Sequence, residues 1–122
     1  MYQVHLSLKD LHKVRNAAQI ITEKIERHFT IPEIAEMVDL PEKKLKAGFK
    51  QLYDKGVFGY RCNFLWNKVK ALLLAELPLK TIAEETGFKD KSALIKAFKN
   101  EYGLTPVQWK KEQENGGITK ES

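Results

Sequence analysis

The chain has 122 residues, the length of one ordinary domain, and an apolar fraction of 43% is enough for a compact core. Its 21 lysines and arginines exceed its 16 acidic residues, and the resulting net charge of +5 favours acidic partners such as nucleic acid. A single cysteine permits no internal disulfide, and no apolar run reaches the roughly 20 residues of a membrane helix or resembles a signal peptide. We therefore expect a cytoplasmic chain that does not contact a membrane.

The first two helices are predicted from apolar spacing and from a capping pattern. Apolar side chains recur in steps of three or four over residues 8–29, which predicts an amphipathic helix that ends near His28. Thr30 and Glu33 have the spacing of a capping box, in which each side chain accepts a backbone N–H of the first helical turn. A second, short helix is therefore predicted over residues 31–37.

The next two helices are predicted from proline, glycine and apolar periodicity. Pro41 has a backbone angle suited to a first helical turn and is predicted to open a lysine-rich helix over about residues 41–54. Lys55 and Gly56 end that helix, and a longer helix is predicted over about residues 59–76.

The second half of the chain is predicted to repeat this order. A short helix over residues 79–85 is followed by Gly87, the residue type best suited to a left-handed turn, and by a helix over about residues 90–102. A final turn of helix carries Trp109, and the polar segment 112–122 is predicted to be disordered. Since no segment alternates in the manner of a strand, the predicted fold is all-α, with about seven helices.

One structural unit occurs twice in the sequence. The tripeptide Ile34-Ala35-Glu36 recurs as Ile82-Ala83-Glu84, at an offset of 48 residues. After one inserted residue the apolar and aromatic positions also recur: Leu45 as Leu94, Phe49-Lys50 as Phe98-Lys99, and Tyr53 as Tyr102. Each unit has a short helix with a small residue in its middle, a turn and a second helix. This is the arrangement of a helix-turn-helix, in which the small residue permits close packing.

The second helix of each unit is predicted to have a polar, largely cationic face opposite its apolar face. At about 100° per residue the outward positions group within a narrow arc: Lys43, Lys46 and Lys50 in the first unit, and Ser92, Lys96 and Lys99 in the second. The major groove of DNA is wide enough to accept such a helix. The alternative is an all-α protein-interaction module, in which the lysines bind an acidic partner or only solvate the surface.

The second unit resembles the DNA-binding domain of AraC/XylS-type transcription regulators. The residues that carry this resemblance, with the spacing typical of that family, are Ile82-Ala83, Gly87-Phe88, Ser92-x-Leu94-x-x-x-Phe98-Lys99 and Gly103-x-Thr105-Pro106-x-x-Trp109-Lys110. The resemblance implies two helix-turn-helix subdomains joined by a long linker helix and covers about residues 8–111. The implied organisation is an AraC-type domain over 1–111, with subdomains at about 8–57 and 78–111, a linker helix at about 59–76, and a tail at 112–122.

The same resemblance implies which residues contact DNA. The expected base-facing residues are Lys43, Lys46 and Ala47 in the first unit and Lys91, Ser92, Ile95 and Lys96 in the second. The expected phosphate contacts are Lys44, Lys50, Lys99, Thr30 and Lys80. If the two recognition helices lie about one turn of DNA apart, roughly 34 Å, they would enter successive major grooves.

The first unit departs from the family pattern at several positions. Pro41 replaces a capping serine, Ala47 replaces a basic residue, and Asn67 replaces a frequent arginine of the linker helix. Gly59 and Cys62 are interpreted as replacing the proline and the tyrosine that usually follow the first unit. The apolar positions are kept, so the expected fold is unchanged.

No other chemistry is indicated. The three histidines and Cys62 lack the spacing of metal ligands, and no catalytic set or phosphate loop indicates an enzyme or a cofactor. Cys62 is interpreted as a small buried residue, and Trp66 and Trp109 as packing residues. The family resemblance implies RNA polymerase as a second partner. No effector or dimerisation domain is recognised, so the chain is interpreted as the DNA-binding fragment of a larger regulator or as a small stand-alone regulator.

Overall fold

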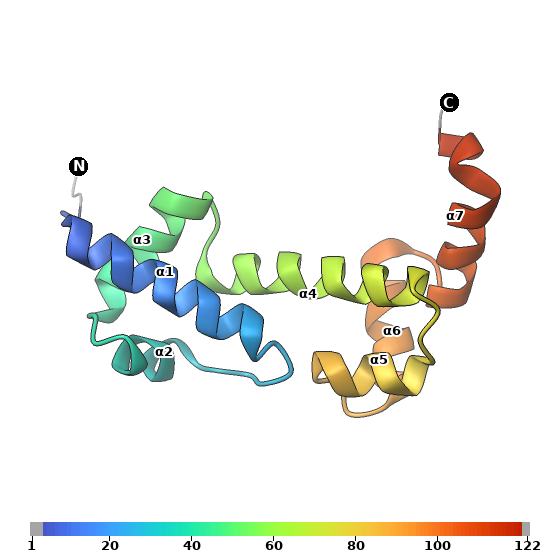
Figure 1. Cartoon of the computed structure of the whole chain (residues 1–122), viewed down its shortest axis with the longest axis horizontal. Helices are drawn as coiled ribbons and strands as arrows, with labels where there is room; N and C mark the ends of the chain where they lie inside the picture. Colours follow the sequence, from blue (N-terminus) through green and yellow to red (C-terminus); the bar gives the residue numbers. More distant parts are fainter. Residues whose placement is uncertain (1–3, 121–122) are drawn as a thin grey trace. The chain divides into compact units, whose positions relative to one another are not determined.

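The computed structural model describes residues 4–120, with side chains described through residue 115, and consists of helices and loops (Figure 1). The seven helices of this described part are α1 (Leu8–Glu23), α2 (Ile31–Met37), α3 (Glu42–Tyr53), α4 (Val57–Leu74), α5 (Leu79–Thr86), α6 (Lys91–Tyr102) and α7 (Pro106–Lys120). The all-α prediction is confirmed. Among the described helices, none is both long enough and apolar enough to cross a membrane.

The chain forms two compact units, which divide between Asn67 and Lys68. The boundary lies inside α4, the helix that the sequence identifies as a linker, so α4 contributes its first part to one unit and its last part to the other. We call these parts of the chain the first unit and the second unit.

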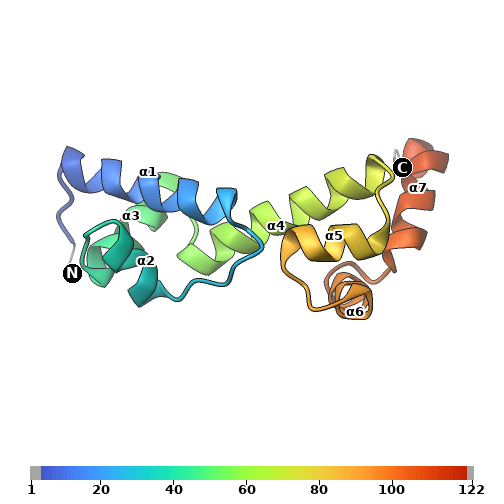
Figure 2. The same cartoon turned by 60° about the horizontal axis from the view of Figure 1, so that its bottom comes forward.

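The first unit is a three-helix arrangement completed by the start of α4. Helix α1 packs against α2 and α3, and α2 packs against α3 (Figure 2). The buried apolar side chains are contributed by all of these elements: Val14, Ala17, Ala18, Ile21, Ile25, Phe29, Ile34, Ala35, Val38, Leu40, Leu45, Phe49, Val57 and Leu65. The burial of these side chains orients α3 by one face, and the opposite face remains on the surface.

The second unit repeats this arrangement with different neighbours. Helix α6 packs against α5 and α7, and the end of α4 supplies Val69 and Leu73 to the core. Buried residues of α5, α6 and α7 complete it: Ile82, Ala83, Thr86, Leu94, Phe98 and Pro106. The hydroxyl of Thr86 is buried and donates a 2.6 Å hydrogen bond to the carbonyl of Ile82, so its polar group is satisfied.

Helix α1 is shorter than its apolar spacing predicts. It ends at Glu23 instead of near His28, although Ile25 and Phe29 are buried as the pattern requires. In the structure the carbonyl of Ile25 accepts a 2.8 Å hydrogen bond from the guanidinium of Arg61, a residue of α4. This distant partner satisfies a carbonyl that a longer helix would have paired internally, and the chain is then extended at Thr30 to cap α2.

Helix α4 begins and ends two residues before its predicted limits. At its start, the carbonyl of Gly56 accepts the N–H of Tyr60. Gly56 therefore stands directly before the first residue of α4, whereas the sequence predicts a helix that begins three residues after it. At its end, Glu76 takes a left-handed conformation with φ of 64°, and the N–H of Leu77 donates to the carbonyl of Leu72. These hydrogen bonds close the helix as a Schellman motif.

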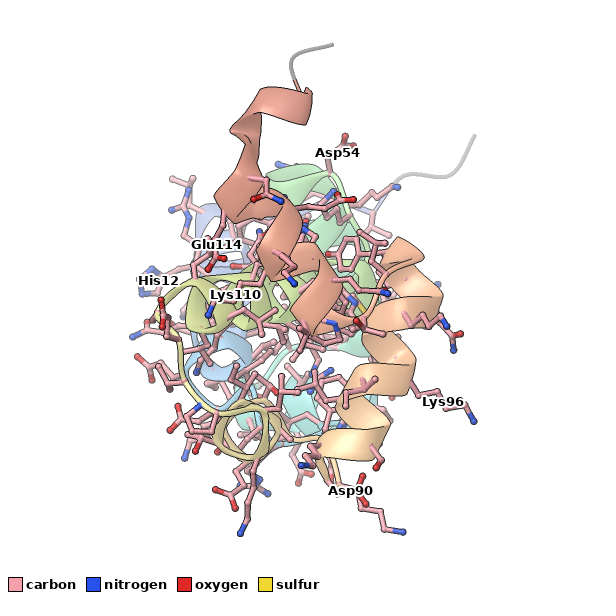
Figure 3. All side chains as sticks on the ribbon, turned by 90° about the vertical axis from the view of Figure 1, so that its right-hand side faces the viewer. His12, Asp54, Asp90, Lys96, Lys110 and Glu114 are labelled. Atoms are coloured by element: carbon pink, nitrogen blue, oxygen red, sulfur yellow. The ribbon has the colours of Figure 1, made fainter. Side chains whose placement is uncertain are left out.

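The remaining helix limits agree with the sequence within about one residue, except at the C-terminus. Helix α7 continues to Lys120, whereas the sequence predicts only a turn of helix and a disordered tail over 112–122. The ammonium of Lys110 lies 3.9 Å from the carboxylate of Glu114, one helical turn beyond the predicted end (Figure 3). This spacing supports a helix in a segment without apolar periodicity. The last two residues of the predicted tail lie outside the described residues.

Candidate nucleic-acid interface

The turn of each helix-turn-helix has the same geometry. A left-handed residue stands at equivalent positions, Asp39 with φ of 56° and Gly87 with φ of 84°. A 2.9 Å backbone hydrogen bond closes both turns, from the N–H of Leu40 to the carbonyl of Ala35 and from the N–H of Phe88 to the carbonyl of Ala83. The two alanines are buried at the contact between the helices, as the repeat predicts. The repeat is therefore structural and not only a similarity of sequence.

The structural repeat extends beyond the segment that the sequence revealed. Helices α3 and α6 both end at a left-handed residue, Asp54 or Gly103, and the next helix begins at a buried residue, Val57 or Pro106. An aromatic cluster then closes each unit, with Phe49, Tyr53 and Tyr60 in the first and Phe98, Tyr102 and Trp109 in the second. The start of α4 thus holds α3 as the start of α7 holds α6.

This extension corrects the assignment of the family proline and tyrosine in the first unit. The sequence was interpreted as placing Gly59 and Cys62 there, but the structural equivalents of Pro106 and Trp109 are Val57 and Tyr60. Cys62 is also exposed and not buried, so that interpretation was wrong as well. The error arose because the sequence between Tyr53 and Tyr60 contains no proline that could be matched to Pro106 of the second unit.

Helix α3 presents most of its lysines on one exposed face. Lys43, Lys46 and Lys50 are exposed, whereas Ala47 beside them is half-buried. Leu45, Gly48 and Phe49 on the opposite face are buried against the other helices. The predicted separation of cationic and apolar faces is therefore present, and Ala47 lies at the edge between the two.

The fourth lysine of this helix has a different environment. The ammonium of Lys44 donates a 3.1 Å hydrogen bond to the carboxylate of Asp10 in α1 and is half-buried. The Ser7 backbone N–H and this ammonium both bond the Asp10 carboxylate, and they lower the pKa of Asp10 below its ordinary value. Lys44 thus ties α3 to α1, and a DNA phosphate would have to compete with Asp10 for it.

Helix α6 presents the equivalent face of the second unit. The side chain of Asp90, the residue before the helix, caps it by accepting the N–H of Ala93 at 2.8 Å. The exposed positions of the helix include Lys91, Ser92, Lys96 and Lys99, and Ile95 is half-buried among them. Figure 3 shows Lys96 extending away from α6, opposite the side on which the helix packs. A large ligand could reach these side chains without a change in the fold.

The two remaining predicted phosphate contacts, Thr30 and Lys80, differ in whether the side chain already has a structural role. The hydroxyl of Thr30 accepts the N–H of Glu33 at 3.2 Å, and its own N–H donates to the Glu33 carboxylate at 2.8 Å, which completes the predicted capping box. Lys80 is exposed in the first turn of α5. Thr30 therefore has a structural role already, whereas Lys80 is open to a ligand.

The sequence reasoning did not identify Gly48, which positions α3. A methyl group built at Gly48 would lie 2.3 Å from a γ-carbon of Val14, a fully buried residue of α1. Glycine at this site therefore permits the close contact of α1 and α3. The available signal was a glycine inside a strong helical pattern, which usually has a packing reason.

The described residues show no group of three histidine, cysteine, aspartate or glutamate side chains placed to hold a metal ion. Each unit instead has a surface of exposed lysines on the second helix of its helix-turn-helix.

Comparison with known proteins identifies this architecture. A family described as "Helix-turn-helix domain" matches residues 34–112. No curated protein sequence matches the chain. Among solved structures, the C-terminal domain of AraT, a response regulator from Geobacillus stearothermophilus, is 27% identical with a TM-score of 0.70, and the similarity covers 88% of each chain. The C-terminal domain of the two-component response regulator YesN from Fusobacterium nucleatum is 33% identical with a TM-score of 0.66, covering 79% of this chain and 95% of that one.

A third similar structure supports the fold alone because its sequence is only 20% identical. It is a transcriptional regulator of the AraC-type DNA-binding domain class from Chromobacterium violaceum, with a TM-score of 0.69, covering 91% of this chain and all of that one. The family match spans more than half of the chain and includes all of the second helix-turn-helix and the first one from Ile34 in α2 onward. The chain belongs to the AraC-type helix-turn-helix family, whose members are DNA-binding domains of transcription regulators and not enzymes.

Proposed function

We propose that this domain binds double-stranded DNA with a preference for sequence, and that α3 and α6 each enter a major groove as recognition helices. One observation carries the proposal: both helices bury one face in their own unit and expose lysines on the other. Lys46, Lys50, Lys96 and Lys99 are exposed, and no ion pair involves them in the described part of the chain. Unpaired ammonium groups on one helix face are suited to the phosphates and guanine edges of a groove.

Base reading is assigned to the middle of each exposed face. Lys43, Lys46 and Lys96 can donate hydrogen bonds to guanine O6 and N7, and Ser92 can bond a base or a phosphate. Ile95 is half-buried and apolar, so it can contact the methyl group of a thymine. Ala47, at the position equivalent to Lys96, offers only a methyl group, and we expect the first unit to read fewer bases there.

Phosphate binding is assigned to the lysines next to the buried phenylalanines. Lys50 follows Phe49 and Lys99 follows Phe98, so each lysine lies at the edge of the exposed helix face. In a major groove this edge would lie beside the phosphate backbone of the DNA. Lys80 is a further candidate. Thr30 and Lys44 are given a smaller part because each already has a partner within the fold.

Selection from a random duplex library, followed by binding measurements on the selected site, tests this proposal. A domain that neutralises about five phosphates should lose affinity with salt at a log–log slope of about −4 to −5. It should also bind the selected duplex more tightly than a scrambled one. If no duplex binds at low salt, DNA binding is refuted and the protein-interaction alternative is favoured.

Two lysine variants separate base reading from backbone binding. Lys96→Ala should cost about 1–3 kcal/mol on the selected site and relax the preference for one base position. Lys50→Ala should weaken binding to every duplex by a similar factor. A uniform loss for Lys96→Ala would contradict its assignment as a base-reading residue.

At the level of the cell, we propose that the domain recruits or blocks RNA polymerase at a promoter in the bacterial cytoplasm, associated with the nucleoid when bound. The two response-regulator structures are themselves C-terminal domains, which supports a role as the DNA-binding part of a larger regulator. Transcription with purified polymerase on a template carrying the selected site tests this. An unchanged transcript level at saturating domain would refute it.

A further inference from the structure

A small cavity lies at the turn of the second helix-turn-helix, between α5 and α6. Its volume is about 250 Å³, and its lining residues are Lys80, Ala83, Glu84, Lys89, Asp90 and Lys91. The three lysines are exposed, and none of them forms an ion pair with another described residue. Lys89 belongs to the turn itself and was not among the residues expected to contact DNA. Three lysine side chains therefore line one hollow, and none of them is bonded to an internal counter-charge in the described part of the chain.

The two carboxylates of the lining do not cancel this charge. Asp90 caps α6 and accepts the N–H of Ala93 at 2.8 Å, so its carboxylate is oriented toward the backbone of its own helix. Glu84 is exposed on α5. Three lysines against these two acids leave the lining with a net charge of +1. In Figure 3, Asp90 marks the N-terminal end of α6, where the cavity is found.

The first unit has the opposite charge at the equivalent place. By the structural repeat, Lys80 corresponds to Pro32 and Lys91 to Glu42, while the N-cap Asp90 corresponds to the N-cap Pro41, so Lys89 is the inserted residue. Ala83 corresponds to Ala35 and Glu84 to Glu36, so this surface has two acids, no lysine and a net charge of −2. The difference of three charges lies at the turn of each motif, where a bound duplex would pass.

We propose that this cavity holds a single DNA phosphate, and that the first unit lacks a counterpart. The inference rests on the proposed DNA binding of the domain. A phosphate diester carries one negative charge, and three ammonium groups around it can share its free oxygens. Lys91 is thereby assigned to the backbone and not to a base. Glu42 in the first unit would repel a phosphate at the corresponding position.

The proposal makes the two units unequal in how they hold DNA. The second unit has a phosphate contact at its turn in addition to the lysines of α6, whereas the first unit depends on the lysines of α3 and, to a smaller degree, on Thr30. The phosphate contact at the α5–α6 turn should therefore contribute part of the salt dependence of DNA binding. This part should be the same for every duplex sequence because a phosphate carries no base information.

Salt titrations on a mixed-sequence duplex test this proposal and require no knowledge of the preferred site. The variants are Lys89→Gln and the triple variant K80Q/K89Q/K91Q, and the matched control is Lys111→Gln, an exposed lysine of α7 in the same unit. Loss of one phosphate contact should flatten the log–log slope by about 0.9. Between 50 and 200 mM salt, the affinity of the triple variant should then fall about 3.5-fold less than that of the unchanged domain.

The pattern across variants decides the result. Lys89→Gln should flatten the slope by only part of the triple variant's change, because Lys80 and Lys91 would still bind the phosphate, and Lys111→Gln should leave the slope unchanged. A slope change of about 2.7 in the triple variant would indicate three separate phosphates and overturn the single site. A triple variant that matches Lys111→Gln would overturn the cavity as a phosphate site.

A chemically modified duplex gives an independent measurement. A duplex from the selection is prepared with single methylphosphonates, which remove the charge of one phosphate at a time. One of these positions should weaken the unchanged domain and leave the triple variant unaffected, and absence of such a position would refute the proposal. If the unchanged domain binds duplexes without sequence preference, the proposed specificity fails, whereas the phosphate site is still decided by these slopes. If it binds no duplex, both proposals fall.

Discussion

The contact between Gly48 and Val14 allows a sharp test of how α3 is held. In Gly48→Ala, the new Cβ would lie 2.3 Å from one γ-carbon of Val14 and 3.3 Å from its other γ-carbon and its Cβ. Carbon atoms prefer separations of about 3.5–4.0 Å, so the first contact is more than 1 Å too short. Val14 is fully buried and, as a β-branched residue in a helix, has essentially one rotamer, so it cannot rotate away.

Two opposing effects set the size of the change. Overpacking a well-packed core costs about 1–3 kcal/mol, and a contact this short belongs at the upper end. Replacing glycine by alanine inside a helix contributes about 1 kcal/mol in the other direction. The expected net loss in the free energy of unfolding is therefore about 2 kcal/mol, measured by urea titration followed by circular dichroism.

A double-mutant cycle isolates the contact. Val14→Ala removes both γ-carbons, so in that background Gly48→Ala should stabilise the domain by up to about 1 kcal/mol. The two substitutions should then be coupled by about 3 kcal/mol. Gly59→Ala is the matched control, since its Cβ would lie 3.7 Å from its nearest neighbour, an ordinary contact. Equal losses from Gly48→Ala in both backgrounds would refute the reasoning.

Three further predictions concern stability. Residue 39 is left-handed, so Asp39→Gly should be more stable than Asp39→Ala by about 1–2 kcal/mol in urea titrations, the reverse of the order of these residues inside a helix. Both variants keep the backbone carbonyl that accepts the 2.9 Å hydrogen bond from Lys13. The lowered pKa of Asp10 provides stability that is present above the unfolded value of 3.8 and is lost as pH falls through the folded value. In Asp10→Asn the urea midpoint should therefore depend less on pH than in the unchanged domain as pH falls below that value. Burial, and then the neighbouring Tyr60, raise the pKa of Tyr53, so its contribution is complete below pH 10 and is lost at higher pH. Tyr53→Phe should therefore lose less stability than the unchanged domain between pH 9 and 11, and an identical loss would contradict this assignment.

The sequence alone determined the features that depend on neighbouring residues. Capping side chains located the starts of α2 and α6, and Gly87 located the end of α5, each within about one residue, because these signals act within one helical turn. The duplicated pattern gave the double helix-turn-helix, since the same small and apolar residues must pack in both units. The exposed lysine faces of α3 and α6 also followed, because residues on one side of a helix keep a fixed angular relation.

The tertiary structure decided the features that depend on distant residues. The carbonyl of Ile25, two residues beyond the end of α1, bonds Arg61, 36 residues away, and the ammonium of Lys44 bonds Asp10, 34 residues away. The need for glycine at position 48 arises from a valine in another helix. The backbone also decides which residue is extra in the second turn, since the equivalent N-caps Pro41 and Asp90 leave Lys89 without a counterpart in the first. Local patterns constrain a helix and its faces, but which partner each side chain meets is set by how the helices pack.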